Sequence, residues 1–260
     1  MSRITQRGAT GPLAVQANGT WQSSTDADLL TLVGSRWDTS DGRELILVKS
    51  ATNTSLAAGK LYQDRPIIAA NQNIAVTAYQ AYSNNGNTPA KVTVTIGETV
   101  TANQYRGGFL VVNDVDGEGQ TLRIASHPAA AGGASCAITL EDGPITGRAL
   151  GTSSEVCLIP AHGLDIVIHP TTPTNVPVGI AITDTSGSTY SFLTAKGICS
   201  ALADATPPTV GVAISASTTT AGAITTFTVL GASGQAISTP IGTAVQTGVS
   251  TEYRTVSLNL

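Results

Sequence analysis

Residues 176–183 read VPVGIAIT, and this run is typical of the stretch from Thr171 to Leu260 that decides the fold. Short runs rich in Val, Ile, Ala and Thr, separated by turn-forming residues, are typical of strands. No part of the stretch has the periodicity of a helix, so we expect a small antiparallel β-barrel or β-sandwich. The other strand-like runs are YSFLTAKG (190–197), VGVAIS (210–215), ITTFTVLG (224–231), TPIGTAVQ (239–246) and YRTVSLNL (253–260).

The same stretch repeats one pattern. The run PVGIA that starts at Pro177 recurs as PIGTA from Pro240, and a tyrosine follows thirteen residues after each proline, Tyr190 and Tyr253. Each tyrosine opens a strand-like run. We expect the two segments to form equivalent strand-turn-strand units, which either duplication or convergent turn chemistry would produce.

Charged residues are scarce, at 12% of the chain against roughly 25% in an average soluble domain. Residues 171–260 hold only Asp184, Lys196, Asp204, Glu252 and Arg254. A monomeric domain keeps its surface polar and charged to stay dispersed. The deficit therefore predicts that partner subunits cover much of this surface, although surface Ser and Thr account for part of it.

Several classes of protein are disfavoured by composition. The net charge is −4, and no segment is basic enough to bind nucleic acid. No apolar run approaches the length of a membrane span, and the opening MSRITQRGATG lacks the apolar core of a signal peptide. Cys136, Cys157 and Cys199 form no CxxC pair, so we expect free thiols rather than a zinc or redox motif.

Residues 1–40 differ from the rest because they are polar and hold both tryptophans, Trp21 and Trp37. We expect an extended N-terminal arm in which Ala27–Val33 is the one ordered run. Tryptophan presents a large apolar surface that is costly to leave in water, so the arm lies either on its own domain or on a neighbouring subunit. The candidate interface residues are Trp21, Leu29, Leu30, Leu32 and Trp37.

The remaining chain divides into a β-rich domain over residues 41–170 and a C-terminal β-barrel or β-sandwich over 171–260. Within the former, residues 66–157 form a second β-rich block that is either an insertion or an added domain. Prolines 170, 173 and 177 mark the expected boundary. All elements read as strands, so the predicted fold class is mostly β.

The most suggestive chemical cluster is Asp114, Asp116 and Glu118 in NDVDGEG. Alternating acidic residues can present oxygens to one Ca²⁺, but the twelfth position of such a loop is Ala125 rather than glutamate. We favour a solvated hairpin tip in which Gly117 and Gly119 adopt positive φ, and cation binding remains open.

No motif predicts catalysis. The histidines His127, His162 and His169 lack paired-ligand spacing, and the chain has no GxSxG elbow, P-loop or dinucleotide fingerprint. We therefore expect a protein that is not an enzyme and that has no catalytic, cofactor-binding or metal-binding residues. A glycan-binding module or glycosidase is disfavoured, because both tryptophans are in the arm and no aromatic platform is evident.

Several segments resemble virion structural proteins of tailed bacteriophages. In the first half these are DGRELILVKS (41–50), SLAAGKLYQ (55–63) and TANQYRGGFLVVNDVDGEGQTLRIASHPAA (101–130). In the last third, VPVGIAITDTSGSTYSFLTAKGIC (176–199) and TPIGTAVQTGVSTEYRTVSLNL (239–260) resemble capsid decoration proteins, also called cement or head-stabilising proteins.

The resemblance implies a β-tulip-like fold, a homotrimer, and binding to the major capsid protein on the outer surface of the virion, after assembly in the host cytoplasm. It implies no nucleic-acid or membrane partner and no cofactor. The chain is long for such a protein, which the block 66–157 would explain. The alternative is another phage β-protein, of the tail, baseplate or host-recognition apparatus.

Overall fold

The computed structural model describes residues 4–6, 27–83, 88–141, 149–228, 239–247 and 249–260. These residues form β-strands and the short 3-10 helices η1 (Ala27–Leu32) and η2 (Ala69–Asn71), with no α-helix among them. The predicted mostly β, antiparallel fold class is thus confirmed. None of the helices in this part of the chain is long and apolar enough to cross a membrane.

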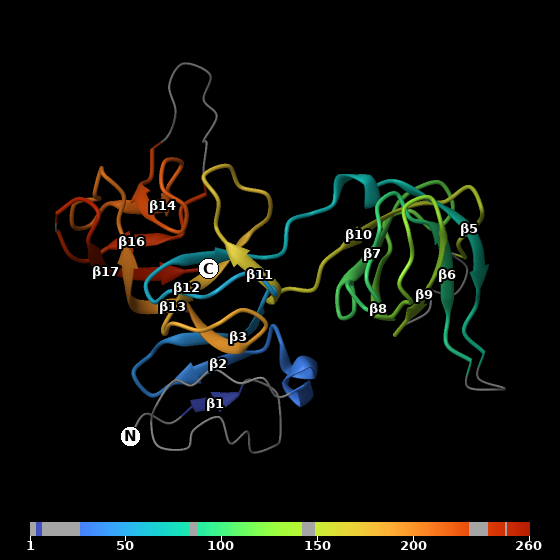
Figure 1. The fold of residues 1–260 in the computed structure, drawn as a ribbon, viewed down its shortest axis with the longest axis horizontal. Coiled ribbons are helices and arrows are strands. Elements are labelled where there is room, and N and C mark those ends of the chain that lie inside the picture. Colours follow the sequence, from blue (N-terminus) through green and yellow to red (C-terminus); the bar gives the residue numbers. More distant parts are fainter. Residues whose placement is uncertain (1–3, 7–26, 84–87, 142–148, 229–238, 248) are drawn as a thin grey trace. The chain divides into compact units, whose positions relative to one another are not determined.

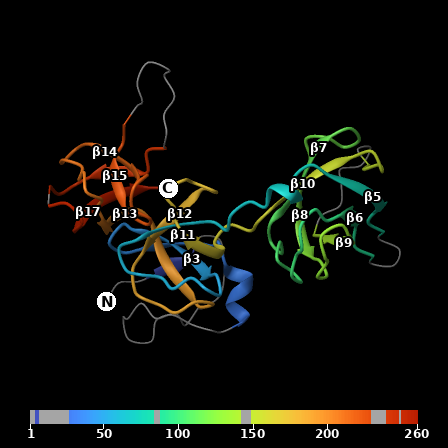
Figure 2. The same ribbon diagram turned by 45° about the horizontal axis from the view of Figure 1, so that its top comes forward.

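The chain divides into two compact units, drawn in Figures 1 and 2. Unit 1 combines Met1–Pro66 with Gly163–Leu260, and unit 2 is Ile67–His162. Unit 2 therefore interrupts unit 1 in the sequence.

Unit 1 contains one sheet, in which the described residues contribute eleven strands in the order β1-β2-β3-β11-β4-β12-β13-β17-β16-β14-β15. All neighbours are antiparallel except β3 and β11, which run parallel. The strands are β1 (Ile4–Gln6), β2 (Arg36–Thr39), β3 (Glu44–Ser50), β4 (Leu61–Gln63), β11 (Leu164–Ile168), β12 (Pro177–Ala181), β13 (Tyr190–Leu202), β14 (Ala213–Ala216), β15 (Ile224–Thr226), β16 (Gly242–Ala244) and β17 (Tyr253–Asn259).

A further pairing between β3 and β13 closes β3, β11, β4, β12 and β13 into a ring. Strand β3 alternates as a strand should: Ile46 and Val48 pack in one apolar cluster, whereas Leu45 and Leu47 pack in another. The first cluster also takes Tyr62 from β4. Both faces of β3 are thus buried, which explains why ELILV is a continuous apolar run.

Strand β13 is thirteen residues long and pairs with two different strands along its length. Its first half, Tyr190–Lys196, pairs with β3, and its second half, Lys196–Leu202, pairs with β17. Gly197 has φ +97°, and a Cβ there would lie 3.1 Å from the Cα of Arg43, so glycine lets the chain turn between the two pairings. The second half covers an apolar cluster with Ile214, Ile224 and Val256.

Unit 2 is a closed antiparallel barrel. The described strands follow one another around it in the order β10-β5-β6-β9-β8-β7. Inward-facing side chains such as Val92, Val94 and Ile124 are fully buried and fill the interior. The strands are β5 (Ile74–Gln80), β6 (Lys91–Thr95), β7 (Phe109–Asp114), β8 (Thr121–Ser126), β9 (Ser135–Leu140) and β10 (Glu155–Ile159).

The division into units differs from the one expected at the prolines. The chain crosses between units at Pro66–Ile67 and His162–Gly163, and the segment around His169 belongs to unit 1. The backbone N–H of His169 donates to Leu61, and its carbonyl accepts from Gly222. Residues 171–260 are therefore not a separate domain, because β13 completes a sheet with β3. The block 66–157 overlaps unit 2.

The repeated pattern corresponds to two strand pairs. Pro177 begins β12 and Tyr190 begins β13, while Tyr253 begins β17, which pairs with β16. Both pairs are antiparallel, and β13 and β17 are direct neighbours. The expected strand-turn-strand units are confirmed in this sheet.

Candidate functional site

A cavity of about 490 Å³ opens within unit 1 beside the bend of β13. This volume is in the range of small-molecule sites, roughly 300–1,000 Å³. Five segments that are far apart in the sequence meet there. The residues that line it are Arg43, Ala58, Gly59, Ala181, Ile182, Asp184, Thr194, Cys199, Ser200 and Tyr253.

Tyr253 forms one wall of the cavity and lies against Gly59. A Cβ on Gly59 would lie 2.4 Å from Cε1 of the tyrosine, so only glycine permits this contact. Gly59 itself is held by backbone bonds, donating to Ala181 at 2.8 Å and accepting from Leu202 at 2.7 Å. The tyrosine nevertheless remains 53% exposed, which leaves much of its ring open to a ligand.

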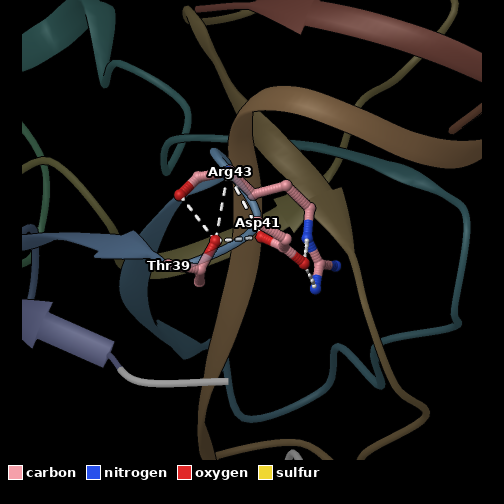
Figure 3. Close-up of polar contacts among 3 residues, drawn as sticks. All are labelled: Thr39, Asp41 and Arg43. Carbon is pink, nitrogen blue, oxygen red and sulfur yellow. Dashed lines mark hydrogen bonds and ion pairs between the residues drawn. The ribbon is translucent and has the colours of Figure 1, made fainter. Parts of the chain in front are cut away.

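Arg43 reaches the cavity from the β2–β3 connection, where a polar cluster fixes it (Figure 3). Its Nε donates to Oδ2 of Asp41 at 2.9 Å, and its Nη2 lies 2.7 Å from the same oxygen. The Thr39 hydroxyl donates to the other carboxylate oxygen and accepts from the Arg43 backbone N–H at 3.0 Å. These bonds from Arg43 and Thr39 hold the pKa of Asp41 well below its usual range.

Asp184 brings a carboxylate to the cavity. Its Oδ1 accepts a hydrogen bond of 2.8 Å from the backbone N–H of Ala58. Thr194, which is 1% exposed, lines another wall, and its Oγ1 has no hydrogen-bond partner among the described residues. A buried hydroxyl without a partner is uncommon in folded proteins. The walls thus offer charged, hydroxyl and aromatic groups together.

The thiol of Cys199 also lines the cavity but is not set up to react. Burial raises its pKa to about 12, an effect that nearby Arg43 only partly opposes. A neutral buried thiol is a poor nucleophile. The lining contains no histidine, and the hydrogen bonds described there join Arg43 to Asp41 and Asp184 to Ala58.

A second feature is a sheet face with few charges, made by the second half of β13, β17 and β16. We call it the uncharged face and define it as Ile198, Ser200, Thr243, Val245, Thr255 and Ser257. Ile198 is 50% and Val245 is 44% exposed. Ser257 pairs with both Ile198 and Thr243, so these side chains form a continuous row across three strands.

The predicted interface residues lie mostly inside unit 1. Trp37 is 5% exposed, packs edge-on against Phe192 with ring centroids 6.0 Å apart, and donates from Nε1 to the Ser35 hydroxyl at 2.8 Å. Leu29 is buried with it, and Leu30 and Leu32 are partly buried against the same cluster.

The part of the arm over residues 27–40 therefore covers its own domain, the first of the two alternatives, because β2 pairs with β3 and its apolar side chains fill that surface. Trp21 lies outside the described residues.

The acidic hairpin tip has the predicted backbone. Gly117 and Gly119 both have positive φ, as expected. Asp114 turns back to accept from the Val115 backbone N–H at 2.7 Å. Among the residues that the structure describes, no group of three or more His, Cys, Asp or Glu side chains is arranged to hold a metal ion.

Sequence reasoning missed the cavity residues Arg43, Asp184, Thr194 and Tyr253 as a group. The repeat drew attention to Tyr253, but nothing local links it to Arg43, which precedes it by more than two hundred positions. Comparison with known proteins adds no assignment, since no family model, curated protein or solved structure matches this chain.

Proposed function

We propose that this protein is a non-enzymatic structural protein of a tailed-bacteriophage virion, which binds the outer surface of the capsid. It stabilises the shell by bridging neighbouring copies of the major capsid protein, and it acts as a homotrimer. The resemblance of residues 41–63, 101–130, 176–199 and 239–260 to such proteins supports this proposal, as does the scarcity of charge.

The uncharged face is the observation that carries the proposal furthest. Its side chains are Ser, Thr, Ile and Val, and Lys196 at the end of the β13 row is the one charged neighbour along these three strands that is exposed. Buried interface cores are depleted in charged residues. Burying such a face contributes roughly 25 cal/mol per Å² of apolar area, without the cost of desolvating charges. The face thus fits a protein partner better than it fits permanent exposure.

The test is co-sedimentation of the purified chain with empty capsids assembled from the major capsid protein of the phage that carries it. Binding is expected for the natural chain, and it should fall at least about tenfold when Ile198→Lys and Val245→Lys place charges on the uncharged face. Val176→Lys is the matched control, because Val176 is 56% exposed, precedes β12 and is not one of the residues of that face. Equal loss in the control, or no binding by the natural chain, would contradict the proposal.

The alternative within phage biology is a tail, baseplate or host-recognition protein. Gold-labelled antibody viewed by electron microscopy separates the two, because decoration places many copies over the head. Label confined to the tail would replace the capsid proposal with this alternative.

A further inference from the structure

Apart from Ser200, the residues that line the cavity in unit 1 do not belong to the uncharged face that supports the proposed capsid role. We infer that it binds a neutral carbohydrate of one or two sugar rings, with Tyr253, Asp184, Arg43 and Thr194 as the contacting residues. This inference goes beyond the proposed function and depends only on the residues that line the cavity.

The aromatic wall is the first argument. An aromatic ring offers an apolar face, and a sugar ring presents apolar C–H groups on one side. Tyr253 is 53% exposed while its ring lies against Gly59, so the ring is held in position and still has surface accessible to a ligand. Ile182 adds apolar surface in the same cavity.

The polar groups are the second argument. A sugar hydroxyl both donates and accepts, so a site for it needs donors and acceptors in one place. Asp184 accepts only, Arg43 donates only, and the hydroxyls of Thr194, Ser200 and Tyr253 do both. The Oγ1 of Thr194 has no hydrogen-bond partner among the described residues, and a ligand hydroxyl would supply one.

Charge is the third argument, because it disfavours phosphates and other anions. Arg43 is the cation of the cavity, and Asp41 engages two of its guanidinium nitrogens through Oδ2. Asp184 adds a second carboxylate. An anionic ligand would meet a guanidinium already paired with Asp41, together with the carboxylate of Asp184, whereas a neutral polyol meets no net repulsion.

The experiment is ligand-observed NMR with the full chain. The probes are glucose, galactose, mannose, N-acetylglucosamine and maltose at millimolar concentration, with methyl phosphate, whose methyl protons report binding, as an anionic comparison. We expect saturation transfer to at least one sugar and none to methyl phosphate. Absence of transfer to every sugar, or transfer to methyl phosphate alone, would overturn the inference.

Two cavity variants, Tyr253→Ala and Thr194→Val, locate the binding, and Tyr82→Ala is the control. Tyr253→Ala should weaken it about tenfold or more, while Tyr82→Ala should leave it within about twofold, since Tyr82 is 49% exposed in unit 2 and outside the cavity. Thr194→Val keeps the shape of the side chain and should preserve thermal stability while weakening binding by roughly threefold to tenfold. Equal losses in Tyr253→Ala and Tyr82→Ala, or unchanged binding in both cavity variants, would place the sugar elsewhere and contradict the inference.

Discussion

The backbone N–H of Tyr105 donates a hydrogen bond of 2.9 Å to Nε2 of His127 inside unit 2. The other ring nitrogen, Nδ1, lies 2.8 Å from the carbonyl of Pro128 and donates to it. Because Nε2 must accept, the imidazole is neutral with its proton on Nδ1. The ring is 5% exposed, and burial lowers the pKa of His127 below its ordinary value, which the Pro128 carbonyl only partly opposes.

This geometry predicts that acid destabilises unit 2. A histidine with a lowered pKa binds its proton more readily in the unfolded chain, so stability is complete above the unfolded pKa of about 6.5 and falls as the pH drops below it. Protonation of Nε2 also removes the acceptor for Tyr105. Hydrogen exchange of peptides from Ile67–His162, followed by mass spectrometry and corrected for the slower intrinsic exchange in acid, should show lower protection at pH 5 than at pH 7.5.

His127→Gln is the matched variant for this prediction. It should lower the stability of unit 2 at neutral pH and flatten the dependence on pH between 7.5 and 5. His169, whose pKa burial also lowers, belongs to unit 1 and remains in this variant as an internal reference. An unaltered slope in the unit 2 peptides would show that another group causes it.

Asn71 is a second residue of unit 2 whose substitution we expect to lower stability. Its Oδ1 accepts from the backbone N–H groups of Gly97 and Glu98, both at 3.0 Å, and its Nδ2 donates to the Tyr105 hydroxyl at 3.2 Å. The side chain is fully buried. Asn71→Ala should cost about 2 kcal/mol of unfolding free energy, because the backbone N–H groups of Gly97 and Glu98 lose their acceptor and the Tyr105 hydroxyl loses a buried partner.

The measurement for Asn71→Ala is urea unfolding followed by far-ultraviolet circular dichroism, with tryptophan fluorescence as the reference for unit 1, where Trp37 is buried. Gln72→Ala is the control, since Gln72 is the next residue and its side-chain Nε2 donates to the carbonyls of Asn71 and Leu158, groups that keep no unpaired donor when it is removed. A loss as small as that of the control would show that the backbone finds other partners.

Much of the fold could be predicted from local pattern. The alternation of KVTVT over Lys91–Thr95 and the apolar run at the start of β3 each reflect a local rule about which faces are buried. The place of each strand in its sheet could not be predicted, because the neighbour of β3 is β13, about 150 residues later. The prolines likewise suggested a domain boundary near residue 170. Strand β13 pairs with β3 across that point, so the two sides belong to one sheet.

The candidate site shows the same limit at the level of single residues. Tyr190 and Tyr253 occupy equivalent places in the repeat, yet Tyr190 is 5% exposed and Tyr253 is 53% exposed. Strand β3 and the cluster around Trp37 cover Tyr190, whereas none of the described residues forms such a layer over Tyr253. Which tyrosine faces a cavity is therefore decided by distant segments, and no sequence pattern near either residue reports it.

Asp204, in the C-terminal part of unit 1, is a third residue whose substitution we expect to lower stability. It is 4% exposed, and its Oδ2 accepts from the Ser217 hydroxyl at 2.9 Å while Oδ1 accepts from the Thr206 backbone N–H at 2.9 Å. Ser217 in turn accepts from the backbone of Thr220 at 3.0 Å. Asp204→Ala should cost about 2 kcal/mol, because the buried Ser217 hydroxyl and the Thr206 backbone N–H both lose their acceptor.

Asp204→Asn is the informative companion, because an amide retains one oxygen acceptor and so should cost less than alanine. Thermal unfolding followed by tryptophan fluorescence measures both. If the two variants were equally destabilised, the negative charge itself rather than the hydrogen bonds would be responsible.

Substitution of Gly59 should lower stability through its contact with Tyr253, which forms a wall of the cavity. Gly59→Ala combines a backbone φ of +76° with a Cβ that would lie 2.4 Å from the ring of Tyr253. Left-handed backbone costs a non-glycine residue about 1 kcal/mol, and displacing the ring adds to this. Gly211→Ala isolates the backbone part, because Gly211 has φ +81° and no atom within 4 Å of its added Cβ.

The difference in unfolding free energy between the two glycine variants thus measures the cost of displacing the Tyr253 ring from Gly59. We expect Gly59→Ala to be less stable than Gly211→Ala in urea unfolding. In the background of Tyr253→Ala the difference should shrink, since the clash has been removed; a double-mutant cycle measures this coupling directly. Additive effects of Gly59→Ala and Tyr253→Ala would mean that the ring does not rest on Gly59 in solution, and the cavity wall would then lack its fixed aromatic face.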